Sequence, residues 1–436
     1  MKRLLLLFAL WKASAFAAGS PDIPAVLTLP QALEIALANS TNIQTAITQL
    51  EQATGQYQQY RSPLLPQLDL HARQSLLTVN LIGAGVPVLG ETGRIGPFGS
   101  MDSRIFLTQE VFNLADRRAW KSAKARQDSS RFLVQNAREL VALNVVATYL
   151  EALRSKATRD SLAAQGTLAD DLYKLTRDRV TQGVAAELEA NRAMQQVNAL
   201  LQQRQEAEQS YIMAKFTLAN ILHARVTSNY EVADPAAYGA GGPPDHAATI
   251  QAALASRADY HSLQANVKAA ELQLKSARAE KLPTLSLGAS DGQSGNSPVH
   301  NVNVYSVSGF VDFPIFNGGR IRGEAEEAEG ALSEARTALE QSRSQIETDV
   351  LASISGVEWA LKEVETSEKN VKLSQQEVEL ARQRFTQGIA DNTEVVNAQD
   401  RLERAADARI RAEFTLGLAR ADLARASGGA EKTYRR

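Results

Sequence analysis

The chain has 436 residues, with 44% hydrophobic and 22% charged side chains, a formal net charge of −2 and no cysteine. These fractions are typical of a globular or long-helical protein, and they exclude a disordered chain and a protein with many membrane-spanning helices. The near-neutral charge gives no general attraction to nucleic acid. The lack of cysteine excludes disulfides, thiolate chemistry and cysteine-ligated metals.

The chain begins with the pattern of a secretory signal. Lys2 and Arg3 precede an apolar run over 4–11, and mostly small residues follow over 13–18. A basic start, an apolar stretch and small residues around a cleavage site are the three parts of a signal peptide. The sequence therefore predicts a signal peptide over residues 1–18. No later stretch approaches the roughly 20 apolar residues of a membrane-spanning helix, so we expect a periplasmic protein or one that spans a membrane as strands.

Two parts of the sequence repeat each other. Residues 65–68 (Leu-Pro-x-Leu) recur as 282–285, and residues 179–185 (Arg-x-Thr-Gln-Gly-x-Ala) recur without a gap as 384–390. Chance rarely keeps one register over such lengths, so the sequence predicts two copies of a unit of about 200 residues. We expect a first copy over 19–224, a linker over 225–245, a second copy over 246–427 and a C-terminal tail over 428–436.

Each copy begins with a predicted helix that leads into strands. The helices, over 30–62 and 246–281, are rich in good helix formers, and Pro66 and Pro283 end them because proline cannot continue a helix. Apolar and polar residues then alternate, which indicates strands with one apolar and one polar face. The predicted strands cover 66–73 and 102–112 in the first copy and 283–289 and 302–313 in the second, with loops over 79–101 and 291–301.

A very long helical pattern follows in each copy. The patterns run over 114–182 and 319–387, and second helices return over 186–224 and 391–427. Each long helix would reach about 100 Å if it were continuous. Asn113 and Asn317 are expected to cap the long helices at their N-termini. Gly183 and Gly388 supply the positive φ that a tight turn between two helices requires.

The returning helix of the first copy carries charges within a heptad stripe. The stripe consists of Val197, Leu201, Arg204, Glu208, Tyr211, Lys215, Leu218 and Leu222. The second copy repeats the order of charges with Arg409, Glu413 and Arg420. Heptad spacing is typical of a coiled coil. Two interpretations of the charges stay open: a snorkelling or solvated stretch where the stripe leaves the core, or a face toward a neighbouring helix pair or a wet lumen.

The predicted strands of one chain cannot close a barrel. Two amphipathic hairpins give four strands, and an open edge inside a bilayer leaves backbone groups unsatisfied at a cost of several kcal/mol each. If these strands span a membrane, several chains must therefore contribute to one barrel. Three chains would give twelve strands, enough for a barrel with a wet lumen. Composition alone does not select three.

The order of helix, hairpin, long helix, Gly turn and returning helix, present twice, resembles the TolC-like outer membrane efflux proteins. The residues that carry the resemblance are Leu65-Pro66-x-Leu68, Val111-Phe112-Asn113, Arg179-x-x-x-Gly183, Leu282-Pro283-x-Leu285, Ile315-Phe316-Asn317-Gly318-Gly319 and Arg384-Phe385-Thr386-Gln387-Gly388. No single motif is specific, and the resemblance rests on their order and duplication over nearly the whole mature chain.

This resemblance implies a mostly α-helical fold with a small β part. A homotrimer would form a 12-stranded transmembrane β-barrel, with four strands per chain, continued by a long periplasmic α-helical barrel. It implies an exit duct in the cell outer membrane, which passively conducts the substrates of a tripartite efflux or type I secretion system. The implied partners are a periplasmic membrane-fusion (adaptor) protein, an inner-membrane pump of the RND, ABC or MFS type, and outer-membrane lipid, with no cofactor, metal or nucleic acid.

The resemblance also implies roles for the two helix–helix turns. The expected contact with the adaptor consists of Arg179, Gln182, Gly183, Val184, Arg384, Gln387, Gly388 and Ile389. The expected gate consists of Glu189, Glu394 and Asn397, where like charges from three chains would converge on one axis and favour opening. The family has an acid at the position of Asn397 and a basic residue at that of Ala390, so the tip differs here. The alternative is that the glutamates are solvated helix residues and the turns are purely structural.

No catalytic constellation is evident in the sequence. The five histidines, His71, His223, His246, His261 and His300, have no pair at a metal-ligand spacing, and there is no G-x-S-x-G motif or P-loop lysine. We therefore expect no enzymatic activity. The alternative function is a periplasmic coiled-coil scaffold or adaptor without a pore, which would lack paired β-hairpins with a lipid-suited face.

Overall fold

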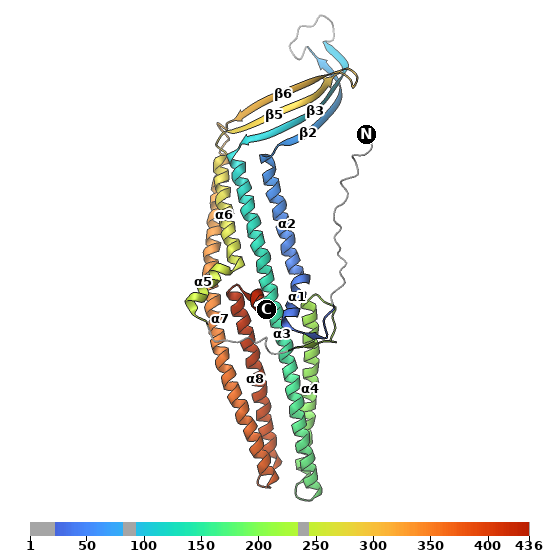
Figure 1. Cartoon of the computed structure of the whole chain (residues 1–436), viewed down its shortest axis with the longest axis vertical. Coiled ribbons are helices and arrows are strands. Elements are labelled where there is room, and N and C mark those ends of the chain that lie inside the picture. Colours follow the sequence, from blue (N-terminus) through green and yellow to red (C-terminus); the bar gives the residue numbers. More distant parts are fainter. Residues whose placement is uncertain (1–21, 82–92, 234–243, 436) are drawn as a thin grey trace. The chain divides into compact units, whose positions relative to one another are not determined.

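The computed structural model describes residues 22–81, 93–233 and 244–435, and it divides into two compact units (Figure 1). Unit 1 comprises Met1–Thr45, Gln135–Ala258 and Arg343–Arg436, and unit 2 comprises Ala46–Val134 and Asp259–Ser342. The predicted signal peptide over 1–18 lies outside the described residues. None of the helices in the described ranges is both long and apolar enough to cross a membrane.

Unit 2 contains a four-stranded antiparallel sheet in the order β2-β3-β5-β6. Its strands are β2 (Gln67–Asn80), β3 (Arg94–Phe112), β5 (Thr284–Gly295) and β6 (Asn301–Asp312), and a 3-10 turn (Ser62–Leu64) precedes β2. All four strands are predicted by the alternation of residues. The loop prediction is wrong over 94–101. The glycines and Pro97 of this stretch are typical of a loop, but its backbone pairs with β2. The loop prediction is also wrong over 291–295, where β5 continues to pair with β6.

The pairing register gives the sheet one mainly apolar and one mainly polar face. The apolar face carries Leu68, Leu70, Ile105, Leu107, Leu287, Tyr305 and Val307. The polar face carries Asp69, His71, Arg73, Arg104, Ser290 and Ser306. The apolar side chains are between 41% and 80% exposed in the single chain. Asp291 interrupts this face between Ile105 and Tyr305, but the number of exposed apolar side chains on it indicates contact with lipid or with another protein.

Helices α2 (Thr41–Arg61) and α6 (Ala258–Ala279) pack in unit 2 with the first parts of α3 (Leu114–Thr181) and α7 (Arg320–Thr386). The predicted long helices are confirmed by α3 and α7. The cap prediction holds for Asn113, whose Oδ1 accepts a 3.1 Å hydrogen bond from the backbone N–H of Asp116. It is wrong for Asn317, because α7 begins only after Gly318 and Gly319, and the carbonyl of Gly319 accepts the bond from Gly323.

Unit 1 contains the remaining elements and the lower parts of both long helices. These elements are β1 (Val26–Leu27), α1 (Leu29–Asn39), α4 (Glu187–Ile221), β4 (Glu231–Val232), α5 (His246–Ser256), α8 (Asn392–Ala426) and α9 (Ala430–Tyr434). The predicted returning helices are confirmed by α4 and α8. Leu162 and Ala169 of α3 pack against Leu200 and Ala207 of α4, and Val357 and Ala360 of α7 pack against Leu416 of α8. Each copy therefore forms a helical hairpin with a coiled-coil type of core.

The first predicted helix of each copy is broken at one residue. Ser40 separates α1 from α2, and Arg257 separates α5 from α6, both with an extended ψ of 124° and 120°. Both side chains are buried. Arg257 forms a 2.9 Å ion pair with Asp349. A single continuous helix is therefore the wrong prediction at both places, and at Arg257 the physical reason is the partner that its side chain finds in Asp349.

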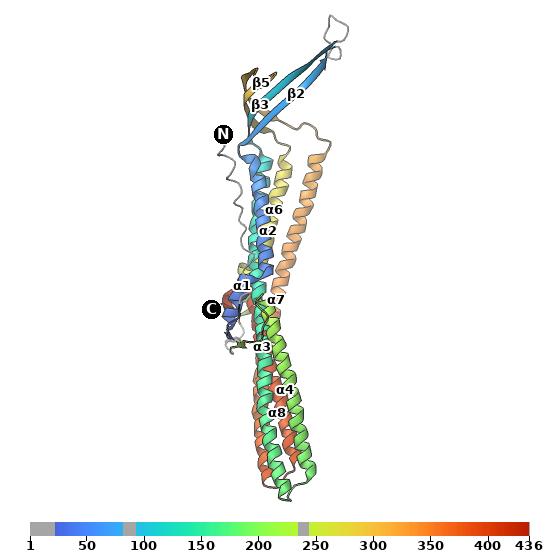
Figure 2. The same cartoon turned by 90° about the vertical axis from the view of Figure 1, so that its right-hand side faces the viewer.

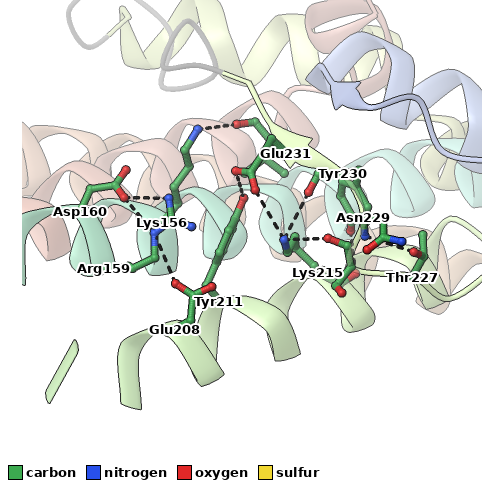
Figure 3. Close-up of polar contacts among 12 residues, drawn as sticks. Lys156, Arg159, Asp160, Glu208, Tyr211, Lys215, Thr227, Asn229, Tyr230 and Glu231 are labelled. Carbon is green, nitrogen blue, oxygen red and sulfur yellow. Dashed lines mark hydrogen bonds and ion pairs between the residues drawn. The ribbon is translucent and has the colours of Figure 1, made fainter. Parts of the chain in front are cut away.

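The segment that follows α4 is fastened to the helices of unit 1 by a buried lysine (Figure 3). Lys215 is 5% exposed, and its Nζ donates to the carbonyls of Ser228 at 2.9 Å and Tyr230 at 3.3 Å. Its ammonium also lies 4.4 Å from the ring centroid of Tyr211. The hydroxyl of Tyr211 donates to Glu231 at 2.8 Å, and burial is the main cause that raises the pKa of this tyrosine. Lys215 therefore lies neither in a solvated stretch nor on a face toward a neighbouring helix pair or a lumen. Both sequence interpretations are wrong for this residue, because its buried ammonium donates hydrogen bonds to carbonyls of the linker.

Candidate functional site at the hairpin end of unit 1

The α3–α4 and α7–α8 hairpins turn at the same end of unit 1 (Figure 2). Gly183 and Gly388 have φ angles of 71° and 73°. The N–H of Val184 donates to the carbonyl of Arg179 at 2.9 Å, and the N–H of Ile389 donates to that of Arg384 at 2.9 Å. This is the Schellman pattern, in which a left-handed glycine satisfies the last carbonyls of a helix. The sequence prediction of two matching helix–helix turns is confirmed in both hairpins.

Each turn presents one large apolar side chain to solvent. Val184 is 62% exposed and Ile389 is 63% exposed, and the adjacent Gln182 and Gln387 are also exposed. Both turns therefore present an apolar side chain at their tip in the single chain. The hairpin end, defined here as residues 179–189 and 384–397, therefore combines apolar tips with amide groups.

Polar contacts hold the two hairpins side by side at this end. Arg179 donates to the carbonyl of Phe385, and its guanidinium lies 4.5 Å from the centroid of that ring. Asn392 donates to the carbonyl of Glu189 at 3.0 Å. Further along the helices, the amide of Gln196 donates to Asp400 at 2.9 Å. The hairpin of the first copy is thus tied to that of the second at several levels.

An apolar cluster lies beneath these polar contacts. It consists of Leu172 from α3, Val378, Ala381 and Phe385 from α7, and Val395 and Ala398 from α8. Phe385 is 1% exposed and is the largest side chain in the cluster. The ring of Phe385 therefore serves two purposes, because it fills the core between the hairpins and lies against the Arg179 cation.

The predicted gate residues are placed differently in the two hairpins. Glu394 lies 3.0 Å from the guanidinium of Arg384, with both side chains about half exposed. Glu189 is partly exposed, and its carboxylate has no ion pair within the described parts of the chain. Asn397 is exposed on α8. The structure thus brings all the predicted turn and gate residues to one end, but it gives only Glu394 a neutralising partner.

A second acidic region lies between the helices further along α8. Glu403 and Asp407 of α8 line a cavity of about 310 Å³ together with Gln203 and Glu206 of α4. Burial raises the pKa of Glu403, and the nearby carboxylate of Asp400 acts in the same direction. Among the described residues, no group of three or more acidic, histidine or cysteine side chains could hold a metal ion. The arrangement offers negative potential and no built metal site.

Some residues at the hairpin end are not recognised from the sequence. Asn392 is fully buried, and Asp391 caps α8 through hydrogen bonds from the backbone N–H groups of Thr393 at 3.1 Å and Glu394 at 3.3 Å. The Asp391 cap has a local signal, since an aspartate followed three residues later by glutamate is a common start of a helix. Asn392 has no such signal, because its partner comes from the other hairpin.

The model of a protein family described as "Outer membrane efflux protein" matches this chain over residues 32–223 and again over residues 249–429. Both matched segments contain the strand pair, the long helix, the glycine turn and the returning helix. Together they cover most of the chain.

Two curated proteins are similar to the chain. It is 28% identical over 332 residues to the pyoverdine export outer membrane protein OpmQ of Pseudomonas putida, which covers 73% of this chain and 66% of that protein. It is 25% identical over 324 residues to OpmQ of Pseudomonas aeruginosa, covering 73% of this chain and 65% of that protein. The aligned region thus spans slightly less than two thirds of the length of each relative.

Solved structures of outer-membrane channels have the same fold. The CmeC outer membrane channel of Campylobacter jejuni has a TM-score of 0.78 at 20% identity, with 92% of this chain and 86% of that chain covered. The outer membrane protein VceC of Vibrio cholerae has a TM-score of 0.79 at 18% identity, with 92% and 96% covered. At these identities the similarity shows the fold alone.

Proposed function

The chain belongs to the outer membrane efflux protein family, and we propose that it is an outer-membrane channel that passively conducts substrates out of the cell. The observation that carries this proposal is the sheet of unit 2. Most apolar side chains lie on one face and are exposed, while most charged and hydroxyl side chains lie on the other. A sheet with these faces suits a wall between lipid and a water-filled lumen.

The two edges of the sheet support an assembly of several chains. Strands β2 and β6 lie at the edges, and the outer edge of each pairs with no other strand in the described ranges. Unpaired strand edges are not tolerated in a bilayer, and joining β2 of one copy to β6 of the next would satisfy both. Such head-to-tail contacts form a ring when the rotation between copies closes, and a closed ring alone leaves no free edge. Three copies would give the twelve-stranded barrel that the resemblance implies.

The hairpin end is the proposed contact with a periplasmic adaptor protein, through which an inner-membrane pump would deliver substrate. The exposed Val184 and Ile389, flanked by Gln182 and Gln387, offer a small apolar surface with amides at its rim. The curated relatives are named for pyoverdine export, so pyoverdine is the first substrate to test.

Glu189, Glu394 and Asn397 are the proposed gate. Carboxylates from several copies would approach one another at a narrow end, and their repulsion is relieved by opening or by a bound cation. The Arg384 guanidinium offsets the charge of Glu394 within the same chain, whereas Glu189 has no such partner among the described residues. We therefore infer that Glu189 contributes the larger share of this repulsion.

The proposed function is tested by reconstitution and fractionation. Purified protein in liposomes should release a small trapped dye, while liposomes without protein should retain it. In cells, the protein should stay with the outer membrane after a carbonate wash. A folded protein that leaves the membrane in carbonate and releases no dye would instead be the periplasmic scaffold, and the channel proposal would be wrong.

A further inference from the structure

The polar face of the sheet in unit 2 separates its charges by sign along the strands. We infer that His71, Arg73 and Arg104 form a basic belt on this face and that the belt binds soluble anions inside the channel, with carboxylate or phosphate groups as its ligands. The inference rests on the proposed function, since the polar face lines a lumen once several copies close the barrel. It adds a binding site to that function and the chemical class of its ligand.

Acidic side chains occupy the end of the polar face that adjoins the helices of unit 2. Asp312 is the last residue of β6, and Glu110 lies two residues before the end of β3. Asp69 is the third residue of β2 and is paired with Phe106. Within the described strands, no basic residue shares this part of the polar face. The helix end of the face is therefore negative.

The basic belt follows further along the same face. His71 is paired with Arg104, and Arg73 is paired with Asp102. Since residues on one face recur at every second position, with about 3.4 Å per residue, the belt begins about 7 Å beyond Asp69. Asp102 accepts hydrogen bonds from Arg104 Nε at 2.6 Å and Nη2 at 2.5 Å, and it offsets one charge. Arg73 is exposed and has no ion pair within the described ranges, so it gives each copy one uncompensated positive charge.

The second hairpin of the sheet adds no charge to the belt. Opposite Arg104, β5 has Gly292, where a Cβ would lie 2.6 Å from the Cα of Arg104, so the two strands approach too closely for a side chain. Val304 of β6 continues the same row. The row that contains Arg73 continues through a serine and a second valine. No acid from β5 or β6 therefore neutralises the belt, and no side chain at position 292 covers it.

The strand that would join β2 in the assembly leaves the belt charged as well. In the proposed ring, β6 of the next copy lies beside β2, which carries His71 and Arg73. The polar face of β6 is uncharged at every second residue from Val302 to Phe310, and the acid on that face is Asp312 at the helix end. The positive charge of the belt is thus retained over a range of registers between copies.

An aromatic ring holds two of the basic groups in place. The ring of Phe106 lies 4.9 Å from that of His71, and the Arg104 guanidinium lies 5.2 Å from the centroid of the Phe106 ring. Side chains that are already held lose less conformational entropy when they bind a ligand. His71 and Arg104 therefore offer a preorganised surface, and the free guanidinium of Arg73 lies beside it.

The summed charge of the belt determines what it attracts. Rings of basic side chains attract anions in pores, as rings of acidic side chains attract cations. Several copies would place their belts around one lumen, whose walls concentrate the field and raise the local concentration of anions. Selectivity between small ions is set where the lumen is narrowest, at the proposed gate, so the belt is expected to act on multivalent anions.

Block of the channel by a soluble anion tests the belt. Inositol hexakisphosphate is added to both chambers during single-channel recording in a planar bilayer at low salt. Wild-type protein should be blocked, and Arg73→Gln should raise the half-blocking concentration about fivefold or more, because each copy loses one positive charge. The matched control is Arg61→Gln, the same change in the last turn of α2, which should leave the block unchanged. Block by the cation spermine should not weaken in Arg73→Gln.

The outcomes separate the belt from the proposed function. Conductance steps that the anion does not block would overturn the belt and leave the channel proposal in place. A block that Arg73→Gln leaves unchanged, or that Arg61→Gln weakens equally, would do the same. Absence of steps from folded and assembled protein would overturn both the channel and the belt.

A second pair of variants separates the net charge from the loss of one side chain. Arg104→Gln alone leaves the Asp102 charge without its partner and should weaken the block as Arg73→Gln does. Arg104→Gln combined with Asp102→Asn keeps the net charge of the belt and should restore most of the block. An equal loss of block in the single and the double variant would contradict a belt that acts through its summed charge.

Discussion

At equivalent positions of the two helical hairpins, the same residue types make different contacts. Arg179 leaves its own hairpin and lies against Phe385, whereas Arg384 stays within its hairpin and pairs with Glu394. The start of α8 is capped by Asp391, whereas the start of α4 has Ala186 at that position and no side-chain cap. The turn geometry is the same in both, with φ angles of 71° and 73° at the glycines.

This difference shows which properties a duplicated sequence passes on to both copies. The backbone turn depends on residues that are present twice, so it is reproduced. The contacts of the arginines depend on what lies beside them, and Phe385 in the second hairpin corresponds to Val180 in the first. The α7–α8 hairpin therefore contains both the buried Phe385 and the capping residue Asp391. The α3–α4 hairpin contacts it through Arg179.

The largest expected effect is that of Phe385→Ala. Removing a fully buried aromatic side chain should lower the free energy of unfolding by about 3–5 kcal/mol. The equivalent Val180→Ala, at a partly exposed position, should cost about 1 kcal/mol. Denaturant unfolding followed by far-UV circular dichroism measures both. Equal losses would contradict the view that the second hairpin carries the core of this end.

Arg179→Ala should have the next largest effect. It removes a charge-assisted hydrogen bond to the Phe385 carbonyl and a contact with the ring, together about 2 kcal/mol. Arg384→Ala removes only a half-exposed ion pair and should cost less than about 1 kcal/mol. The same unfolding measurement compares the two variants. A larger loss of unfolding free energy for Arg384→Ala than for Arg179→Ala would contradict the conclusion that Arg179 holds the two hairpins together.

The helix caps give a smaller and reciprocal pair of effects. Asp391→Ala should destabilise the start of α8 by about 1 kcal/mol, because two backbone N–H groups lose their acceptor. Ala186→Asp should stabilise the start of α4 by a similar or smaller amount. Amide hydrogen exchange at the first turns of the two helices measures each change locally. Unchanged protection in both variants would show that the caps do not account for the difference.

The smallest expected effect is that of the ion pair between Arg384 and Glu394. Exposed pairs contribute about 0.2–1 kcal/mol, and salt screens them. A double-mutant cycle with Arg384→Gln and Glu394→Gln should give a coupling energy in this range at low salt and nearly none at high salt. A coupling that persists at high salt would mean that the pair becomes buried on assembly.

Much of the fold follows from local patterns. The long helices, the four strands and both glycine turns have signals in residue spacing that do not depend on distant partners. The break at Arg257 and the burial of Lys215 lack such signals, because Asp349 and the linker carbonyls satisfy these side chains only after folding. The first part of β3 contains Gly96, Pro97 and Gly99, which are typical of a loop, yet its backbone pairs with β2.

The same distinction applies to the hairpin end. The residues of both turns are predictable because the sequence around Gly183 and Gly388 is duplicated. The partner of Arg179 is not predictable, because Phe385 is 206 residues away in the other copy. Asp391 could have been recognised as a cap from the glutamate three residues later, whereas the tie from Asn392 to Glu189 required the structure.

Single-channel recording in a planar lipid bilayer tests the central claim most directly. Wild-type protein should give small, cation-selective conductance steps, and Glu189→Gln should enlarge them more than Glu394→Gln, since only Glu394 has a cation beside it. If neither substitution changes the conductance steps, the protein is still a channel, but neither glutamate forms its gate. No steps from folded and assembled protein would contradict the account that this chain forms a channel.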